Sequence, residues 1–254
     1  MKKRNRKLRK VLLALSCMLT LVAVTVGATL AYLTDTAEVV NTFTVGNVQI
    51  DLNETDVDGK NGTKENDYHL VPGATYVKDP TVTVKANSEP AYVRMLVTVE
   101  DYMDLFNSTR NHESEIDDMT VQFGNRTPLN PKVFMDISDA WIPTKVTIVA
   151  SPVASCTYEY RYMDTTEKNT QDVALPALFT ELTIPGCFTN DDLLALKEGY
   201  CWKGGAQGND SVTYLGSENM YCYPFKITVR AEAIQAVGFD NADAAWEAFD
   251  AQMN

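Results

Sequence analysis

Alternation of apolar and polar residues with a period of two is the feature that most restricts the fold of this 254-residue chain. In the segment AYVRMLVTVE, residues 91–100, Val93, Met95, Val97 and Val99 fall on one face of an extended strand. Related patterns occur at 47–52, 81–84, 119–123, 145–150, 156–163, 180–184 and 223–234. These segments, separated by polar or Gly/Pro turns, predict about nine strands without regular crossover helices, and therefore an all-β, antiparallel sandwich of jelly-roll type.

Two short helices are predicted near the end of the chain. Residues 189–199 begin with Thr189 as an N-cap and carry acidic residues in the first turn. Residues 241–249 begin with Asn241 and place Trp246 and Phe249 on one helical face. We expect this second helix to pack against the sandwich.

The first 31 residues have the pattern of a secretory signal peptide. Residues 1–10 contain seven basic side chains and no acid, and residues 11–33 contain no charge. The small residues that follow the apolar run predict cleavage between Ala31 and Tyr32, with Ala28 as the second choice. Residues 1–31 would then be a signal helix and residues 32–254 a single sandwich domain. An uncleaved anchor is the alternative, because the apolar run is long enough to span a bilayer.

Charge restricts the partners of the exported chain. The net charge of the whole chain is −12, and removal of the seven basic residues in the signal would make it −19. Such a surface repels phosphate backbones, so nucleic acid is excluded as a partner. It suits divalent cations and keeps separate copies soluble until a specific contact joins them.

Four cysteines lie after residue 150, at Cys156, Cys187, Cys201 and Cys222. An even number in an exported chain is compatible with disulfides, for which four cysteines allow three connectivities. A Cys201–Cys222 bridge that closes the Gly-rich loop is the first choice, and free thiols are the alternative. The spacing does not predict a structural zinc site.

Catalytic motifs are not recognisable. In HESEI, His112 and Glu113 would begin a zinc-peptidase helix, but Ile116 occupies the place of the second histidine. The only other histidine is His69. We predict no catalytic residue and no cofactor other than calcium.

A calcium loop is the one metal pattern. In residues 54–65, oxygen donors stand at loop positions 1, 3, 5 and 12, with Gly59 at position 6. The donors are Glu54, Asp56, Asp58 and Glu65. A mobile acidic hairpin loop is the favoured interpretation and weak calcium binding the alternative, because position 1 is Glu and a strand rather than a helix precedes the loop.

Several short segments form a further pattern: the junction at 31–35, NTFTVG at 41–46, and Pro72-Gly73, Lys78-Asp79-Pro80 and Ala91-Tyr92-Val93-Arg94. These segments resemble the TasA and CalY (camelysin) family of exported Gram-positive proteins. The segments 178–193 and 227–249 are similar to closing segments of TasA-like proteins. Together they cover about half of residues 32–254.

The resemblance implies a secreted jelly-roll protein that a SipW-type signal peptidase processes and that assembles with itself into fibres of the biofilm matrix or cell surface. The freed segment 32–44 would add as a strand to a neighbour's sheet. Its apolar residues, which would make the contact, are Tyr32, Leu33, Val39, Val40 and Phe43. Fold-back of residues 32–44 into the chain's own sandwich is the alternative.

Two other functions remain open. Camelysin-like members are described as surface metallopeptidases, but no zinc motif here matches that activity. A monomeric surface adhesin, or an accessory protein of the matrix, is the third reading.

Overall fold

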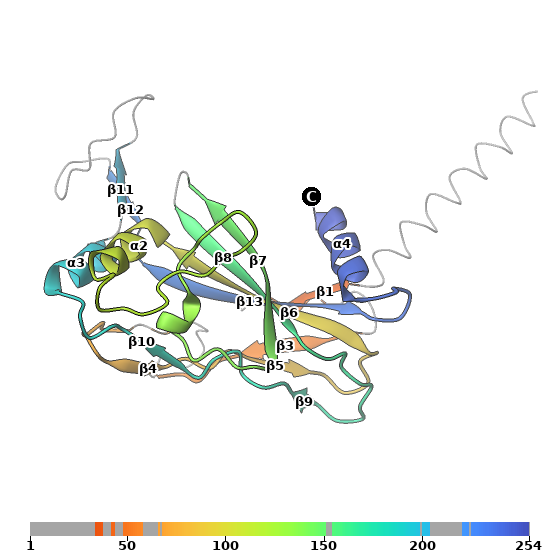
Figure 1. Cartoon of the computed structure of the whole chain (residues 1–254). Helices are drawn as coiled ribbons and strands as arrows, with labels where there is room; N and C mark the ends of the chain where they lie inside the picture. Colours follow the sequence, from red (N-terminus) through yellow and green to blue (C-terminus); the bar gives the residue numbers. More distant parts are fainter. Residues whose placement is uncertain are drawn as a thin grey trace, which may run out of the picture.

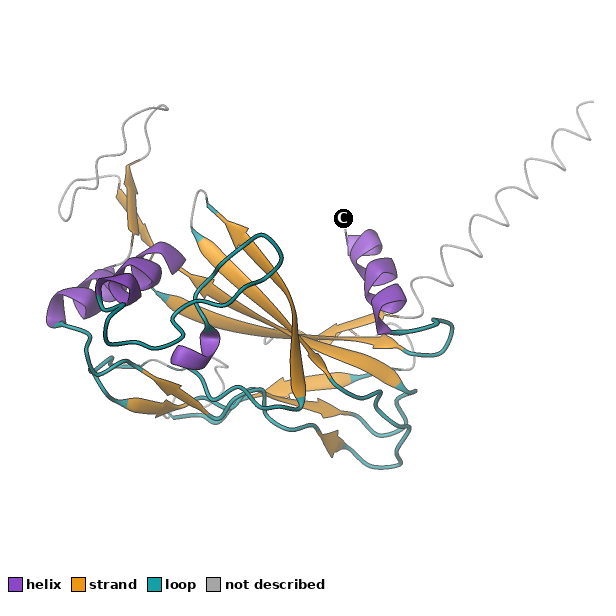
Figure 2. Cartoon of the chain, in the orientation of Figure 1, coloured by secondary structure: helices purple, strands orange, loops and turns teal. Residues whose placement is uncertain are grey.

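The computed structural model describes residues 34–37, 42–43, 48–57, 66, 68–150, 154–198, 200–203, 220–223 and 225–253. Within these ranges, strands dominate and three short α-helices are present (Figure 2). Every pairing between the named strands is antiparallel. The predicted all-β class with a few short helices is therefore confirmed at the level of an antiparallel, sandwich-like fold.

The largest sheet has six strands in the order β2-β1-β13-β6-β8-β7. In chain order these are β1 Thr34–Ala37, β2 Thr42–Phe43, β6 Ala91–Glu100, β7 Trp141–Val149, β8 Ser155–Tyr162 and β13 Lys226–Gln235. Strands β13, β6 and β8 form its centre, so residues more than 100 positions apart in the sequence pair directly.

A smaller sheet, in the order β3-β5-β9, lies along one face of the six-stranded sheet (Figure 1). It is built from β3 Ile50–Asn53, β5 Thr81–Val84 and β9 Val173–Ala174. Two further pairs complete the strands: β4 Thr75–Val77 with β10 Glu181–Thr183, and β11 Tyr200–Lys203 with β12 Met220–Tyr223.

The main core lies between the two sheets. Val93, Met95, Val97 and Val99 of β6 are buried there, as the alternation predicted. The smaller sheet contributes the alternate residues Ile50 and Leu52 of β3 and Val82 and Val84 of β5. Burial of one face of each sheet fixes the strand register, because a slip of one residue would turn the apolar set toward water.

The opposite face of the six-stranded sheet is covered in part by α4, Ala242–Met253 (Figure 1). Trp246 and Phe249 are each 1 % exposed and pack with Ile234 and Ala245 in a second apolar cluster. The side chain of Asn241 accepts a hydrogen bond from Ala244 N at 2.9 Å, which is the predicted N-cap. The prediction of a helix that packs on the sandwich is confirmed.

The other predicted helix is α3, Asn190–Glu198. Thr189 caps it: Thr189 Oγ1 accepts from Asp192 N at 3.3 Å, and Thr189 N donates to Asp192 Oδ2 at 2.8 Å. This reciprocal pair is a capping box in which aspartate replaces the usual glutamate.

Two local predictions were wrong. Helix α2, Tyr102–Asn111, was missing from the predicted elements. Its Tyr102 and Leu105 are buried in the core, and this burial stabilises a segment in which Asn, Ser and Thr have low helix propensity. Residues 119–123 were expected as a strand but form only isolated bridges, Thr120 with Leu129 and Phe123 with Arg126. The short 3₁₀ helix η1, Pro131–Val133, follows them.

The predicted signal helix, residues 1–31, lies outside the described residues. Among the residues that are described, no helix has both the length and the apolar character needed to cross a bilayer.

Candidate functional site

The segment predicted to be donated is found, for the part that is described, in the chain's own sheet. Strand β1 pairs with β13 over four residue pairs: Thr34 with Ile234, Asp35 with Ala233, Thr36 with Glu232, and Ala37 with Ala231. Strand β2 then pairs with β1, with Phe43 opposite Thr36. The fold-back alternative is therefore the arrangement seen for Thr34–Ala37. Tyr32, Leu33, Val39 and Val40 lie outside the described residues.

Strand β13 is longer than the part of it that pairs with β1. On its other side, β6 pairs with all ten residues from Lys226 to Gln235, whereas β1 pairs only with Ala231–Ile234. Within the described part of the chain, Ile227–Arg230 have no strand partner on the β1 side. We call β13, on the side that faces β1, the acceptor edge.

The opposite edge of the same sheet is protected against strand addition. Strand β7 contains Pro143, which has no N–H to donate, and its pairing with β8 shifts register between Pro143 and Lys145. The Lys145 side chain is 59 % exposed on this edge strand. Proline, a bulge and an exposed lysine are features that prevent edge pairing, so the acceptor edge is the better docking position of the two.

Four residue positions were predicted for calcium, and two of them are described. Glu54 binds Lys78, whose Nζ lies 2.9 Å from each carboxylate oxygen, and it also accepts from Tyr68 OH at 3.2 Å. Burial and the charge of Glu54 raise the pKa of Tyr68, so this hydroxyl stays protonated. Asp56 is exposed, and Asp58 and Glu65 lie outside the described residues. The calcium loop stays a prediction, but Glu54 has a different role in the structure, as the partner of the buried Lys78.

Two of the four candidate disulfide cysteines are free thiols, which was the alternative reading. Cys156 is fully buried on β8 and Cys187 is half-buried in the loop before α3. Burial raises the pKa of Cys156 to about 11, so its thiol is inert at neutral pH.

For the other two cysteines, the backbone supports the first choice. Cys201 of β11 and Cys222 of β12 are direct partners in the antiparallel register. Such partners lie about 4.5–5.5 Å apart at Cα, within the span of a disulfide. We expect peptide mass mapping of the unreduced protein to recover a linked Cys201–Cys222 pair. Alkylation of both thiols without prior reduction would contradict this.

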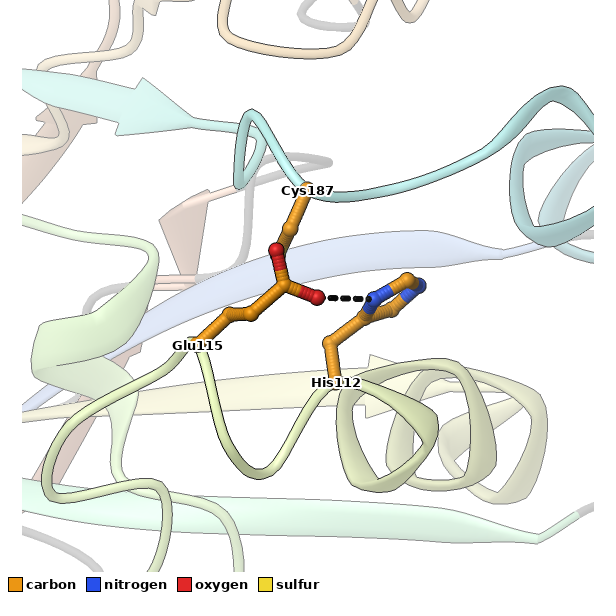
Figure 3. Close-up of side chains that lie close together, drawn as sticks. All are labelled: His112, Glu115 and Cys187. Carbon is orange, nitrogen blue, oxygen red and sulfur yellow. Dashed lines mark hydrogen bonds and ion pairs between the residues drawn. The ribbon is translucent and has the colours of Figure 1, made fainter.

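The two histidines do not share a group of potential metal ligands in the described part of the chain. His69 is exposed, and its carbonyl accepts from Tyr76 OH at 2.6 Å. His112 stacks on Phe188 with 5.8 Å between ring centroids. Its ring lies beside Glu115 and Cys187 (Figure 3). The sequence pattern HESEI indicated His112 as a potential ligand, but nothing in the sequence linked it to Cys187.

Comparison of the chain with protein-family models, with curated proteins and with solved structures found no match.

Proposed function

We propose that this chain is an exported structural subunit that assembles into cell-surface or matrix fibres by exchange of its N-terminal strand. The proposal includes signal cleavage between Ala31 and Tyr32 and a jelly-roll arrangement of the sandwich, as the resemblance to the TasA and CalY family implies. The observation that carries it is the position of β1 at the acceptor edge, directly after the predicted cleavage site.

The first support is that β1 is a short strand. It pairs with β13 over four residues, and its sequence, TDTA, contains no large apolar side chain. Because the net contribution of a backbone hydrogen bond is only about 0.5–1.5 kcal/mol, such a strand can separate without unfolding the sandwich.

The second support is that exchange conserves the contacts. A β1 strand from a neighbouring copy would make the same four pairs with β13 as the chain's own β1 does. Exchange of an identical element therefore costs little enthalpy, as in domain swapping. A head-to-tail contact of this kind does not close on itself, so it extends into a filament.

The third support is the role of proteolysis. While residues 1–31 are attached, the apolar run holds the start of β1 at the membrane and no free strand end exists. Cleavage would produce that end only outside the cell. The charge of −19 on the cleaved chain then keeps unassembled copies apart through like-charge repulsion.

Removal of the N-terminal strand is expected to abolish fibres. We expect residues 32–254 to form filaments in electron micrographs, and a chain that begins at Val45, which lacks β1 and β2, to stay unpolymerised. Equal polymerisation of both forms would rule out β1 as the donated strand.

A cross-link between copies tests the acceptor edge directly. Asp35→Cys and Ala233→Cys are made in separate chains, because Asp35 and Ala233 are register partners. When the two variants are mixed and oxidised, exchange predicts a disulfide-linked dimer that neither variant forms alone. Thr34→Cys mixed with Ala233→Cys is the control, because successive residues of a strand point to opposite faces.

A monomeric surface protein is the second candidate, and the pairing of β1 with its own β13 favours it. The mixed cross-link separates the two. A monomer would give no linked dimer, and Asp35→Cys with Ala233→Cys in one chain would give only an internal bridge.

A further inference from the structure

Three metal-ligating side chains of different chemistry meet at one end of the sandwich. His112 and Glu115 lie in the turn that follows α2, and Cys187 lies in the loop between β10 and α3 (Figure 3). The ring nitrogen of His112, a carboxylate oxygen of Glu115 and Sγ of Cys187 all lie within 4.8 Å of one another. The turn is closed by backbone bonds from Glu115 N and Ile116 N to His112 O, at 2.9 and 3.1 Å, so the fold fixes the backbone positions of its two ligand residues.

The imidazole of His112 is oriented by a fourth residue. Its Nε2 lies 3.0 Å from Asp192 Oδ2, and Asp192 is only 7 % exposed. Asp192 is itself held by Thr189 N at 2.8 Å and Thr189 Oγ1 at 2.6 Å. Although burial opposes it, hydrogen bonds from Thr189 and His112 lower the pKa of Asp192, so it is a carboxylate. A carboxylate that accepts the outer N–H of a histidine is the usual second shell of a metal-bound imidazole.

This arrangement assigns the two ring nitrogens. Asp192 engages Nε2, so Nδ1 is the ring nitrogen that lies toward Glu115 and Cys187 and would bind a metal. Nδ1 lies 3.2 Å from Glu115 Oε1. Without a metal, a proton on Nδ1 bridges this pair, and a bound metal would displace that proton.

The spacing matches a tetrahedral metal. With metal–nitrogen and metal–oxygen bonds of about 2.0–2.1 Å, two ligand atoms of a tetrahedral zinc ion lie roughly 3.3 Å apart. A thiolate at about 2.3 Å needs a slightly longer separation, and Cys187 Sγ lies within 4.8 Å of the other two ligand atoms.

We propose that His112, Glu115 and Cys187 bind a divalent transition metal of the zinc class, with Asp192 as the positioning residue of the histidine. Nitrogen and thiolate ligands select such a metal over calcium or magnesium, which prefer oxygen alone. The site is separate from the calcium loop predicted at 54–65 and from the acceptor edge.

The fourth metal position would face a cleft. Glu115 and Cys187 line an open cleft of about 550 Å³, together with Ile116, Asp117, Val133, Pro185 and Gly186. Three protein ligands beside an open space are typical of a zinc ion that keeps a water molecule, whereas a fully protein-ligated ion is structural.

Cobalt provides a spectroscopic test that does not depend on any activity. The full-length chain, kept in solution by a mild detergent and reduced, is freed of metal and titrated with Co²⁺. We expect one equivalent to produce thiolate-to-cobalt charge-transfer absorption in the near ultraviolet. Cys187→Ser is expected to remove this band, and zinc to displace the cobalt.

Two variants test the geometry. Asp192→Asn is expected to weaken Zn²⁺ binding by about 10–100-fold, as loss of an outer carboxylate does, measured by competition with a chromophoric chelator. Glu115→Gln should also weaken it, and because this side chain is 58 % exposed the variant keeps its fold.

His69→Ala is the matched histidine control, and the double change Cys201→Ser with Cys222→Ser is the thiol control. Both should leave the cobalt spectrum unchanged. A band that survives Cys187→Ser, a band that disappears in either control, or equal zinc affinity in wild type and Glu115→Gln would overturn the assignment.

Discussion

Arg94→Ala is expected to lower the free energy of unfolding by about 3–5 kcal/mol, because removal of one partner from a buried ion pair leaves the others uncompensated. Domains of this kind are stable by only about 5–15 kcal/mol, so the variant should be close to unfolded at 37 °C. Urea unfolding followed by circular dichroism measures the change.

The physical reason is the number of carboxylates that depend on this one guanidinium. Arg94 Nε and Nη2 both lie 2.6 Å from Glu232 Oε2, and Nη2 lies 2.6 Å from Asp250 Oδ1. Nη1 lies 3.3 Å from Glu159 Oε2. The side chains of Arg94, Glu159 and Glu232 are 5 %, 5 % and 1 % exposed, so water cannot replace the lost cation.

A neighbouring arginine supplies the control. Arg230 Nη2 also lies 2.7 Å from Glu232, but its side chain is 36 % exposed. Arg230→Ala should therefore cost no more than about 1 kcal/mol. If the two alanine variants lose the same stability, the buried cluster around Arg94 is not what holds this face together.

A further variant tests whether uncompensated buried charge explains the effect of Arg94→Ala. Arg94→Met combined with Glu159→Gln and Glu232→Gln removes the buried cation and the two most buried anions. We expect this triple variant to recover part of the stability that Arg94→Ala loses, because no unpaired charge stays buried. A triple variant less stable than Arg94→Met alone would contradict the electrostatic explanation.

Sequence periodicity predicted the central strands because the alternation of apolar and polar residues that marks a half-buried strand lies within the strand itself. The residues Val93, Met95, Val97 and Val99 can be recognised as one buried face from spacing alone. The same spacing puts Arg94 on the opposite face of the strand but does not show that this residue is buried, at 4 % exposed. Its burial has a specific cause: α4, more than 140 residues later in the chain, covers Arg94, and no pattern near residue 94 predicts this contact.

The candidate sites also combine features that one segment encodes with contacts that only the folded chain brings about. His112 and Glu115 stand three residues apart in HESEI, but the sequence analysis considered only His112 and Glu113 there. Cys187 and Asp192 join them through the packing of α2 near α3. The pairing of β1 with β13 likewise joins opposite ends of the chain. Sequence reasoning supplied the segment and the alternative of fold-back, and only the folded register could identify the acceptor edge.

Helix α4 bears on the proposed fibre assembly, because it packs on the strand that would accept the exchanged strand. It packs on β13, the strand that carries the acceptor edge, and its Asp250 pairs with Arg94 of the adjacent strand β6. A rigid β13 is required if an incoming strand is to find a preformed edge, because an edge that must first be ordered adds conformational entropy to the cost of docking. The fold therefore supports the acceptor edge from the outer face through α4 and from the core face through β3.

Trp246→Ala is expected to cost about 3–5 kcal/mol, the usual loss when a buried tryptophan is truncated to alanine. Trp246 is 1 % exposed and meets Phe249 edge to face, with 5.5 Å between ring centroids. The guanidinium carbon of Arg94 lies 4.3 Å from the centroid of the Trp246 ring, which adds a cation–π contact. Hydrogen exchange should show faster exchange along α4, and urea unfolding should show the loss of stability.

Glu247→Ala is the matched control, because Glu247 is the exposed neighbour on the same helix, and its substitution should change stability by no more than about 0.5 kcal/mol.

The contact between Trp246 and Arg94 makes the stability losses of Arg94→Ala and Trp246→Ala dependent on each other. In a double-mutant cycle, Arg94→Ala and Trp246→Ala should be non-additive by about 0.5–3 kcal/mol, as for residues in direct contact. Additive losses would mean that the ring and the guanidinium stabilise the protein independently, and that α4 is held by apolar packing alone.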